Sequence, residues 1–427
     1  MIKNNYLLIA DSFKYALTKA LPGIMGFFSV IIIVKIVGPE EYGKYSILLS
    51  FILTLSAFCV GWLNQALLRY YPGYNSTQEL ENHAMIALVI SVIIGVSILL
   101  AISLLIRNNI LSFVQIPLSI GLFVAVSLFQ FLSSIYRAQL RPNTVIIITS
   151  VQSILALLIP LFFIYNFSPK VKYIILGLTI AYIIPTLGKV LSKLFVWKNF
   201  LIFTSIVNQE SKALLLDLFR FGWPLSIWIT INLSLSFFDR SFIKYYYSFD
   251  QTGIYASIYD LVIRFFSIIL FPITIAMHPR IMKLWNNEDH KNAIYLWKYA
   301  MKMQIVAFAG IITFGVLFYE NIISLLTWVF NDLDPNYFYL LPYLAVGGFI
   351  WQFALLIHKP LELLKKTHLM LIAMILSLIV NLTGNILFLP KWGLIATAYT
   401  YIVSGTVYIL FSFYLAKNSF REKKLFV

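Results

Sequence analysis

Long apolar runs separated by short polar links dominate the pattern of the chain. Runs of 18 or more mostly apolar residues recur about twelve times, without the period-two alternation of a membrane β-barrel. Such runs predict membrane-spanning helices, because a helix satisfies its own backbone hydrogen bonds in hydrocarbon. The predicted spans cover approximately residues 12–35, 45–68, 84–106, 117–138, 144–166, 173–196, 220–246, 253–278, 294–318, 337–358, 367–389 and 393–416. The pattern therefore predicts an all-α polytopic membrane protein.

The two halves of the chain resemble each other. Gly43-Lys44-Tyr45 follows two acidic residues at the start of the second span, and Gly253-Ile254-Tyr255 follows Asp250 at the start of the eighth. Phe129-Gln130-Phe131 in the fourth span matches Trp351-Gln352-Phe353 in the tenth. Both offsets are about half the chain length, which predicts two pseudo-symmetric six-helix bundles with a substrate path at their interface. The predicted limits are 1–198 for the N-terminal bundle, 199–219 for a cytoplasmic linker and 220–427 for the C-terminal bundle.

Basic residues in the links are distributed unequally between the two sides of the membrane. Seven lie on one side, namely Lys35, Lys44, Arg107, Lys170, Lys172, Lys244 and Lys391. The other side holds more, namely Lys3, Arg69, Arg137, Arg141, Lys193, Lys198, Lys212, Arg280, Lys283, Lys291, Lys365, Lys366, Lys417, Arg421, Lys423 and Lys424. The richer side is expected to be cytoplasmic, so both termini are predicted in the cytoplasm.

Composition removes several classes of function. Hydrophobic residues make up 60% of the chain and charged residues 11%, far from the balance of a soluble domain. The net charge of +15 is spread over short links, without the basic patch that nucleic-acid binding needs. The five histidines lie singly, the only cysteine is Cys59, and no HExxH, GxxxxGK[ST] or GxSxG motif occurs. We therefore expect neither an enzyme nor a metal or other cofactor.

Charged residues inside the apolar runs are the candidate functional residues. Asp260 and Arg264 in the eighth span have (i, i+4) spacing, acid before base, on one helix face. Arg264 follows Gly253 by about 11 residues, roughly 16 Å along a helix and near the middle of a ~30 Å hydrocarbon layer. An arginine there costs several kcal/mol unless it is paired or faces a wet cavity. The pair therefore either lines a transport path or is a salt bridge that holds helices together.

Four further residues carry charge within or at the ends of spans. Lys19 is expected two to three turns inside the membrane in the first span, and Arg69 ends the second. Asp239-Arg240 closes the seventh span and is either an ion pair at the outer mouth or part of the functional site.

Basic groups outnumber the unpaired acids among these positions, which predicts a cationic cavity suited to phosphate oxygens. The predicted substrate-binding residues are Lys19, Arg69, Arg240 and Arg264, and the predicted coupling or ion-pair residues are Asp239 and Asp260.

Residues 40–46 (EEYGKYS), residues 220–224 (RFGWP), Asp239-Arg240 and Gly253-Ile254-Tyr255 together resemble a known family. They are similar to the polysaccharide biosynthesis (Wzx-type flippase) family of the multidrug/oligosaccharidyl-lipid/polysaccharide exporter superfamily. The resemblance covers essentially the whole chain and implies a MATE-like fold. Related lipid-linked precursor flippases keep basic residues in the first and eighth spans, a pattern that Lys19 and Arg264 resemble.

The function that the resemblance implies is a flippase of the bacterial inner membrane. By alternating access, it would move undecaprenyl-diphosphate-linked oligosaccharide, an O-antigen (lipopolysaccharide) or capsule repeat unit, from the cytoplasmic to the outer leaflet. Its implied partners are this polyprenyl-diphosphate-linked glycan, the lipid bilayer, a polysaccharide polymerase and a chain-length regulator. Two alternatives remain: a cation-coupled small-molecule or drug antiporter of the same superfamily, and a polysaccharide polymerase. The first six predicted spans hold no acidic residue deep in the membrane, which disfavours the antiporter. No large external insert is visible, which disfavours the polymerase.

Overall fold

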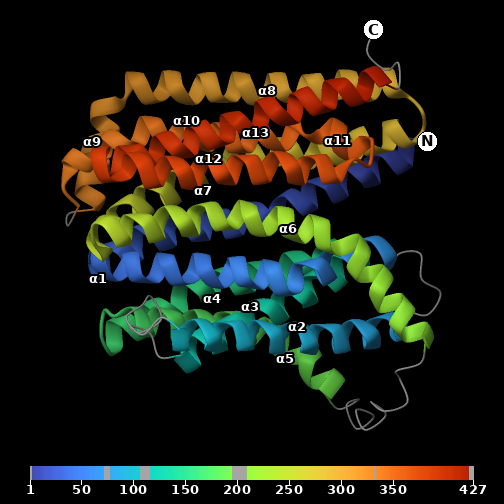
Figure 1. Ribbon diagram of the computed structural model, residues 1–427, viewed down its shortest axis with the longest axis horizontal. Helices are drawn as coiled ribbons and strands as arrows, with labels where there is room; N and C mark the ends of the chain where they lie inside the picture. The colour runs from blue at the N-terminus through green and yellow to red at the C-terminus, as the bar shows by residue number, and fades with distance from the viewer. Residues whose placement is uncertain (1, 72–76, 106–115, 195–208, 331–332, 423–427) are drawn as a thin grey trace. The chain divides into compact units, whose positions relative to one another are not determined.

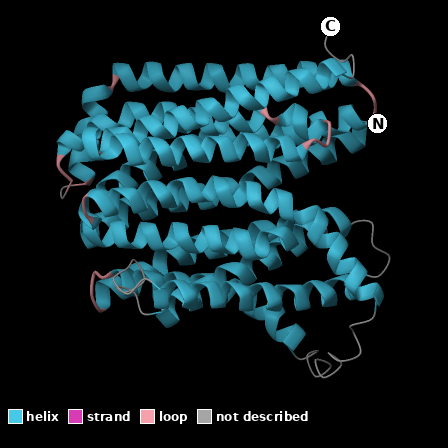
Figure 2. Cartoon of the chain, in the orientation of Figure 1, coloured by secondary structure: helices cyan, strands magenta, loops and turns pink. Residues whose placement is uncertain are grey.

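The computed structural model describes the backbone of residues 2–71, 77–105, 116–194, 209–330 and 333–422, and the side chains of 21–71, 79–104, 116–187, 213–330 and 333–419. This described backbone is helical almost throughout and contains no β-strand (Figure 2). Ten helices within it are long and apolar enough to cross a membrane, and Val171–Leu187 is a shorter apolar helix. The predicted all-α polytopic class is therefore confirmed.

The helices divide between two compact units of the chain. One unit is Met1–Ser46 with Phe238–Val427, and the other is Ile47–Phe237. Two long helices, α1 (Ile2–Tyr70) and α6 (Gln209–Tyr246), contribute a segment to each unit. The bundles predicted at 1–198 and 220–427 divide the chain at a different place in the sequence from these units. The predicted domain limits stay a prediction.

The unit Ile47–Phe237 contains four complete helices besides its parts of α1 and α6 (Figure 1). They are α2 (Thr77–Leu105), α3 (Ile116–Ala138), α4 (Pro142–Asn166) and α5 (Val171–Leu194). α5 packs against both α3 and α4, and α2 packs against α3. The buried hydroxyl of Ser226 in α6 donates to the carbonyl of Ala57 in α1 at 2.6 Å, so polar side chains also link helices in this unit.

The unit Met1–Ser46 with Phe238–Val427 holds the remaining helices, and Figure 1 labels them. They are α7 (Phe249–Asn286), α8 (His290–Leu317), α9 (Tyr319–Val329), the 3₁₀ turn η3 (Pro335–Tyr339), α10 (Leu340–Ile357), α11 (Lys359–Leu363), α12 (Thr367–Trp392) and α13 (Leu394–Glu422). α10 packs against α7 and α13, while α13 also packs along α12 and α8 along α7. The polar residues of α7, α12 and α13, and those of α6 from Phe238 on, belong to this unit.

Two predicted spans, 12–35 and 45–68, are joined within α1 by a kink instead of a separate loop. The kink is at Gly38, whose φ of 76° and ψ of 170° are non-helical. Glycine adopts positive φ without a Cβ penalty, and Pro39 next to it suits the first turn of the following helical segment. The other predicted spans overlap one described α-helix each, and the span 337–358 also includes part of η3.

The two similar Gly-x-Tyr motifs lie against each other inside one unit. A Cβ on Gly43 of α1 would overlap the backbone carbonyl of Phe249, and a Cβ on Gly253 of α7 would overlap that of Pro39. The contact is reciprocal, because each glycine meets the residue four positions before the other glycine. The similarity between the halves of the sequence therefore corresponds to a close helix crossing that leaves no room for side chains.

Candidate functional site

A buried ion pair joins α6 to α7. Arg240, which is 5% exposed, donates from Nη2 to Asp260 Oδ1 at 2.5 Å and from Nη1 to the carbonyl oxygen of Ser46 at 3.0 Å. The hydroxyl of Tyr42 donates to the other carboxylate oxygen, Asp260 Oδ2, at 2.8 Å. The guanidinium of Arg240 also lies over the ring of Tyr259, 5.6 Å from its centroid. Arg240 is thus held by a carboxylate, a carbonyl and an aromatic face.

The acid–base pair expected along α7 is not the ion pair that forms. Asp260 binds Arg240 and Tyr42, and no ion pair joins it to Arg264 among the described side chains. A same-helix pair is a weak, solvent-screened interaction, whereas a guanidinium from another helix and a phenol satisfy both carboxylate oxygens in a buried place. The salt bridge considered between Asp260 and Arg264 is therefore not the one in the structure, where Arg240 is the basic partner of Asp260.

Asp239 and Arg240 likewise do not pair with each other. Successive residues of an α-helix point about 100° apart, so two neighbours face different helices. Arg240 faces α7, whereas Asp239 Oδ1 accepts hydrogen bonds from α12, at 3.0 Å from Asn381 Nδ2 and 2.8 Å from Asn385 Nδ2. Asp239 is 1% exposed, and its second oxygen, Oδ2, has no hydrogen-bond partner within the described part of the chain.

The amide of Asn385 extends this second cluster to α13. Its Oδ1 accepts from the hydroxyl of Thr397 at 2.9 Å. The two asparagines and Thr397 are fully buried. Sequence reasoning missed all three, although two amides spaced (i, i+4) in an apolar span were a usable signal, since polar side chains inside a membrane helix require partners.

Arg264 has a different environment from Arg240. It is half-buried on α7 and packs against Gly26 of α1, where a Cβ would overlap its guanidinium. It makes no ion pair with any carboxylate whose side chain the structure describes. The glycine thus provides room for a cation that no described carboxylate neutralises.

The remaining two predicted basic residues lie elsewhere. Lys19 is in α1, and its side chain falls outside the described residues. Arg69 is exposed in the last turn of α1, within the unit Ile47–Phe237, whereas Arg240 and Arg264 belong to the other unit. Of the six predicted residues, the structure brings Arg240 and Asp260 into direct contact.

Two histidines that lie apart in the sequence belong to one charged cluster in the structure. Lys359 Nζ, at the start of α11, is 2.5 Å from Glu362 Oε2 and 2.8 Å from His278 Nδ1 on α7. His358 Nε2 is 3.2 Å from Glu362 Oε1, and its Nδ1 is 2.9 Å from the hydroxyl of Tyr408 on α13. The spacing along the chain did not indicate this cluster, because its residues come together from separate helices. The cluster ties α7, α11 and α13 together and leaves its charges paired.

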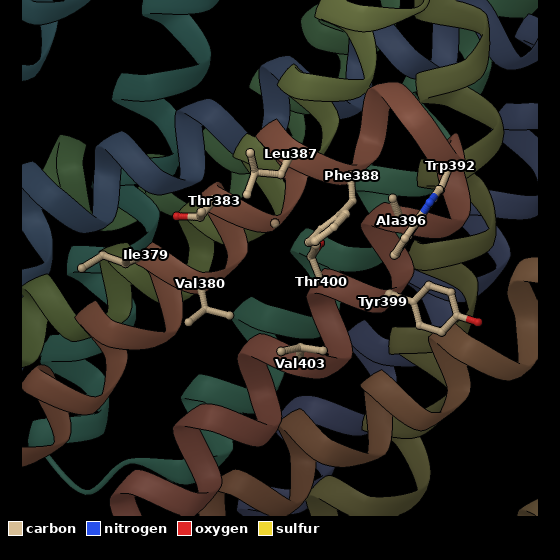
Figure 3. Close-up of a pocket in the computed structure, with 11 residues that line it drawn as sticks. Ile379, Val380, Thr383, Leu387, Phe388, Trp392, Ala396, Tyr399, Thr400 and Val403 are labelled. Atoms are coloured by element: carbon tan, nitrogen blue, oxygen red, sulfur yellow. The ribbon is translucent and has the colours of Figure 1, made fainter.

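An apolar groove of about 350 Å³ lies between α12 and α13 (Figure 3). Its wall includes Ile379, Leu387, Phe388, Trp392 and Val403, several of which are about half exposed. The groove has no charged side chain in its lining. It fits a hydrocarbon chain and not a phosphate, so we do not place the anion site there.

These features define the class of the chain: a multi-pass helical membrane protein with the fold of MATE transporters. It is similar to the inward-facing and outward-facing structures of a multidrug resistance MATE family transporter, with TM-scores of 0.68 and 0.66 and 14% and 15% identity. The alignments cover 96% and 98% of this chain and 98% and 96% of those chains. A transporter of the same superfamily from Pyrococcus furiosus aligns with a TM-score of 0.61 at 16% identity, over 96% of this chain and 95% of that one. At these identities the similarity shows the shared fold.

The chain belongs to the polysaccharide biosynthesis protein family, whose model matches residues 8–285. The resemblance seen in the sequence is therefore confirmed at the level of the family. An uncharacterized membrane protein of Methanocaldococcus jannaschii is 21% identical over 416 residues, which cover 90% of this chain and 80% of that protein.

Proposed function

We propose that the chain is a flippase for polyprenyl-diphosphate-linked oligosaccharide, an O-antigen or capsule repeat unit. It moves this lipid from the cytoplasmic to the outer leaflet of a bacterial inner membrane, with both termini in the cytoplasm. Membership in a polysaccharide biosynthesis family, together with a transporter fold, supports this choice. Lipid-linked precursors are made on one side of a membrane and used on the other, so such a pathway needs a transporter.

The single observation that carries the proposal is the contrast between the two membrane arginines of one unit. Arg240 is neutralised by Asp260, whereas Arg264 has no ion pair within the described structure. A cation inside a membrane span needs an anionic partner or water. A diphosphate supplies that partner, because guanidinium groups form charge-assisted hydrogen bonds with phosphate oxygens.

Arg264 is therefore proposed as the main diphosphate contact. Lys19, Arg69 and Arg240 are proposed as further substrate-binding residues, and Arg240 would exchange Asp260 for phosphate when it binds. The glycan occupies a polar lumen, while the polyprenyl tail stays in the lipid. Alternating access then moves the headgroup while the tail stays in hydrocarbon. The transport barrier therefore does not include the large free energy of exposing the apolar tail to water.

The test is a flipping assay in liposomes that contain the purified chain and an undecaprenyl-diphosphate-linked oligosaccharide, scored by cleavage of exposed glycan by an added glycosidase. Arg264→Ala should lower the flipping rate at least tenfold, which corresponds to about 1.4 kcal/mol in the barrier. Arg264→Lys should keep part of the activity, because it keeps the charge but not the planar donor geometry. Lys302→Ala, an exposed change on α8, is the matched control and should flip normally.

Two outcomes would contradict the proposal. Normal flipping by folded Arg264→Ala would exclude the anion contact. Ion-gradient-driven uptake of cationic dyes by the parent, with no flipping, would instead support the antiporter alternative. The double variant Arg264→Ala with Asp260→Ala should not recover activity, since Asp260 pairs with Arg240.

A further inference from the structure

The apolar groove between α12 and α13 lies on the same helix face as a lysine at the end of α12. Val380, Gly384 and Leu387 line the groove on this helix (Figure 3). Lys391 is the next position of their stripe, because spacings of four, three and four residues keep one face of a helix with 3.6 residues per turn. Lys391 is exposed, and no carboxylate forms an ion pair with it among the described side chains. The stripe therefore joins an apolar wall to a positive charge.

The groove is about as long as one leaflet of a bilayer is thick. Ile379 and Trp392 are the first and last residues of α12 in its wall, and their 13 positions of helix correspond to roughly 20 Å. Half of a ~30 Å hydrocarbon layer is about 15 Å. Trp392 and Lys391 end the helix with the residue types that anchor spans at the membrane–water interface. The groove thus extends from the interface into the hydrocarbon.

The shape and the surface of the groove select its occupant. Both of its helices are long and apolar enough to cross a membrane, and Ile379, Leu387 and Val403 of its wall are 53%, 52% and 49% exposed. An exposed apolar face in a membrane span is covered by hydrocarbon, because water would penalise it. An α-helix with its side chains is about 10–12 Å across, too wide to enter a groove of about 350 Å³. A single hydrocarbon chain fits.

We propose that this groove binds one anionic phospholipid of the membrane, with an acyl chain between α12 and α13 and its phosphate at Lys391. The ammonium group attracts a negative headgroup at the interface, and its hydrogen bonds to phosphate oxygens are charge-assisted. The two helices meet below the chain, because a Cβ on Gly384 would overlap the methyl group of Thr400. The site lies apart from the diphosphate contact proposed on α7, so it stands or falls without the flippase assignment.

The experiment titrates palmitoyl-oleoyl phosphatidylglycerol into the full-length chain in detergent and follows thermal unfolding. A lipid that binds the folded state raises the midpoint by mass action, and we expect a saturable rise of roughly 2–6 °C. Phosphatidylcholine with the same acyl chains should need a roughly fivefold higher mole fraction, since its headgroup has no net charge. Lys391→Ala should weaken the response to phosphatidylglycerol by the same factor. Lys170→Ala, a change at an exposed lysine in the link between α4 and α5, is the matched control and should respond like the parent.

Two further variants test the groove itself. Val403→Trp fills it from the α13 wall and Val380→Phe from the α12 wall, and both should lose the saturable rise. Val306→Trp is the matched control, because Val306 is 61% exposed on α8, away from the groove, and it should keep the rise. Native mass spectrometry should retain one phosphatidylglycerol per parent chain and none on Val403→Trp.

Three results would overturn the proposal. Equal responses of the parent to phosphatidylglycerol and phosphatidylcholine, or an undiminished response in Lys391→Ala, would show that the headgroup is not recognised. An undiminished response in Val403→Trp and Val380→Phe would show that the lipid binds elsewhere. Displacement of the retained phosphatidylglycerol by an equimolar amount of undecaprenyl phosphate would assign the groove to a polyprenyl tail instead of a membrane phospholipid.

Discussion

Asp260 on α7 faces a guanidinium and a phenol, whereas Asp239 on α6 faces two side-chain amides. Both are carboxylates within membrane-spanning helices of the same compact unit. Asp260 has a partner on each oxygen and a full opposite charge, so its cluster is complete within the chain. Asp239 accepts two hydrogen bonds on one oxygen, whereas its second oxygen has no partner among the described residues and no opposite charge lies at hydrogen-bond distance.

The difference separates two kinds of charged group in a membrane protein, those that the chain itself neutralises and those that it does not. A charge that the chain itself neutralises serves structure, because removing either partner leaves the other exposed to hydrocarbon. A charge that the chain leaves uncompensated points to a ligand or an ion. Arg240 and Arg264 differ in the same way, with the first bound to Asp260 and the second without a described carboxylate.

The largest expected effect separates the two carboxylates directly. Asp260→Asn should cost about 3–5 kcal/mol of stability, because it leaves the guanidinium of Arg240 buried without its counter-charge. Asp239→Asn should cost about 1 kcal/mol or less, since it removes an uncompensated charge and keeps the shape. Thermal unfolding of both variants measures the contrast.

A double variant checks the cause of that effect. Replacing the whole pair, as in Arg240→Met with Asp260→Leu, should recover much of the stability lost in Asp260→Asn, because no buried charge remains. Equal losses in Asp260→Asn and Asp239→Asn would erase the distinction between the clusters.

An intermediate effect should follow the loss of one hydrogen bond to the complete cluster. Tyr42→Phe removes the donor to Asp260 Oδ2 and should cost about 1.5–3 kcal/mol, the usual range for a bond to a charged group. Tyr255→Phe is the matched control, since Tyr255 is also buried on these helices and its hydroxyl has no partner among the described residues. It should be close to neutral in the same unfolding assay, and a similar loss in both variants would mean that packing, not the hydrogen bond, matters at Tyr42.

The smallest expected effect concerns the helix crossing beside the complete cluster. Gly43→Ala places a methyl group against the backbone carbonyl of Phe249 and should cost about 1–3 kcal/mol through overpacking. Gly310→Ala on α8 is the control, since nothing lies within 4 Å of its added Cβ, and it should be neutral or stabilising. An equal loss of stability in Gly43→Ala and Gly310→Ala would mean that the close helix crossing is not the cause.

The sequence by itself determined the class, the spans and the family. Apolar runs of membrane length can only become helices, and this property is local, so twelve spans could be marked without knowing their neighbours. It also singled out the intramembrane charges, because their cost does not depend on which helix lies beside them. The motifs at residues 40–46 and 220–224, together with Asp239-Arg240 and Gly253-Ile254-Tyr255, indicated the polysaccharide biosynthesis family, which the family model confirms.

The tertiary structure alone decided which groups meet. Spacing along one helix suggested that Asp260 pairs with Arg264 and that Asp239 pairs with Arg240. In the packed structure, Asp260 forms its ion pair with Arg240. Asp239 accepts hydrogen bonds from Asn381 and Asn385. A side chain in a packed bundle can bind a partner on any adjoining helix. The spacing of residues along one helix does not determine which other helices pack against it. The crossing of Gly43 with Gly253 and the pairing of Lys359 with His278 have the same origin: each joins residues at least 80 positions apart that meet only after the helices have packed.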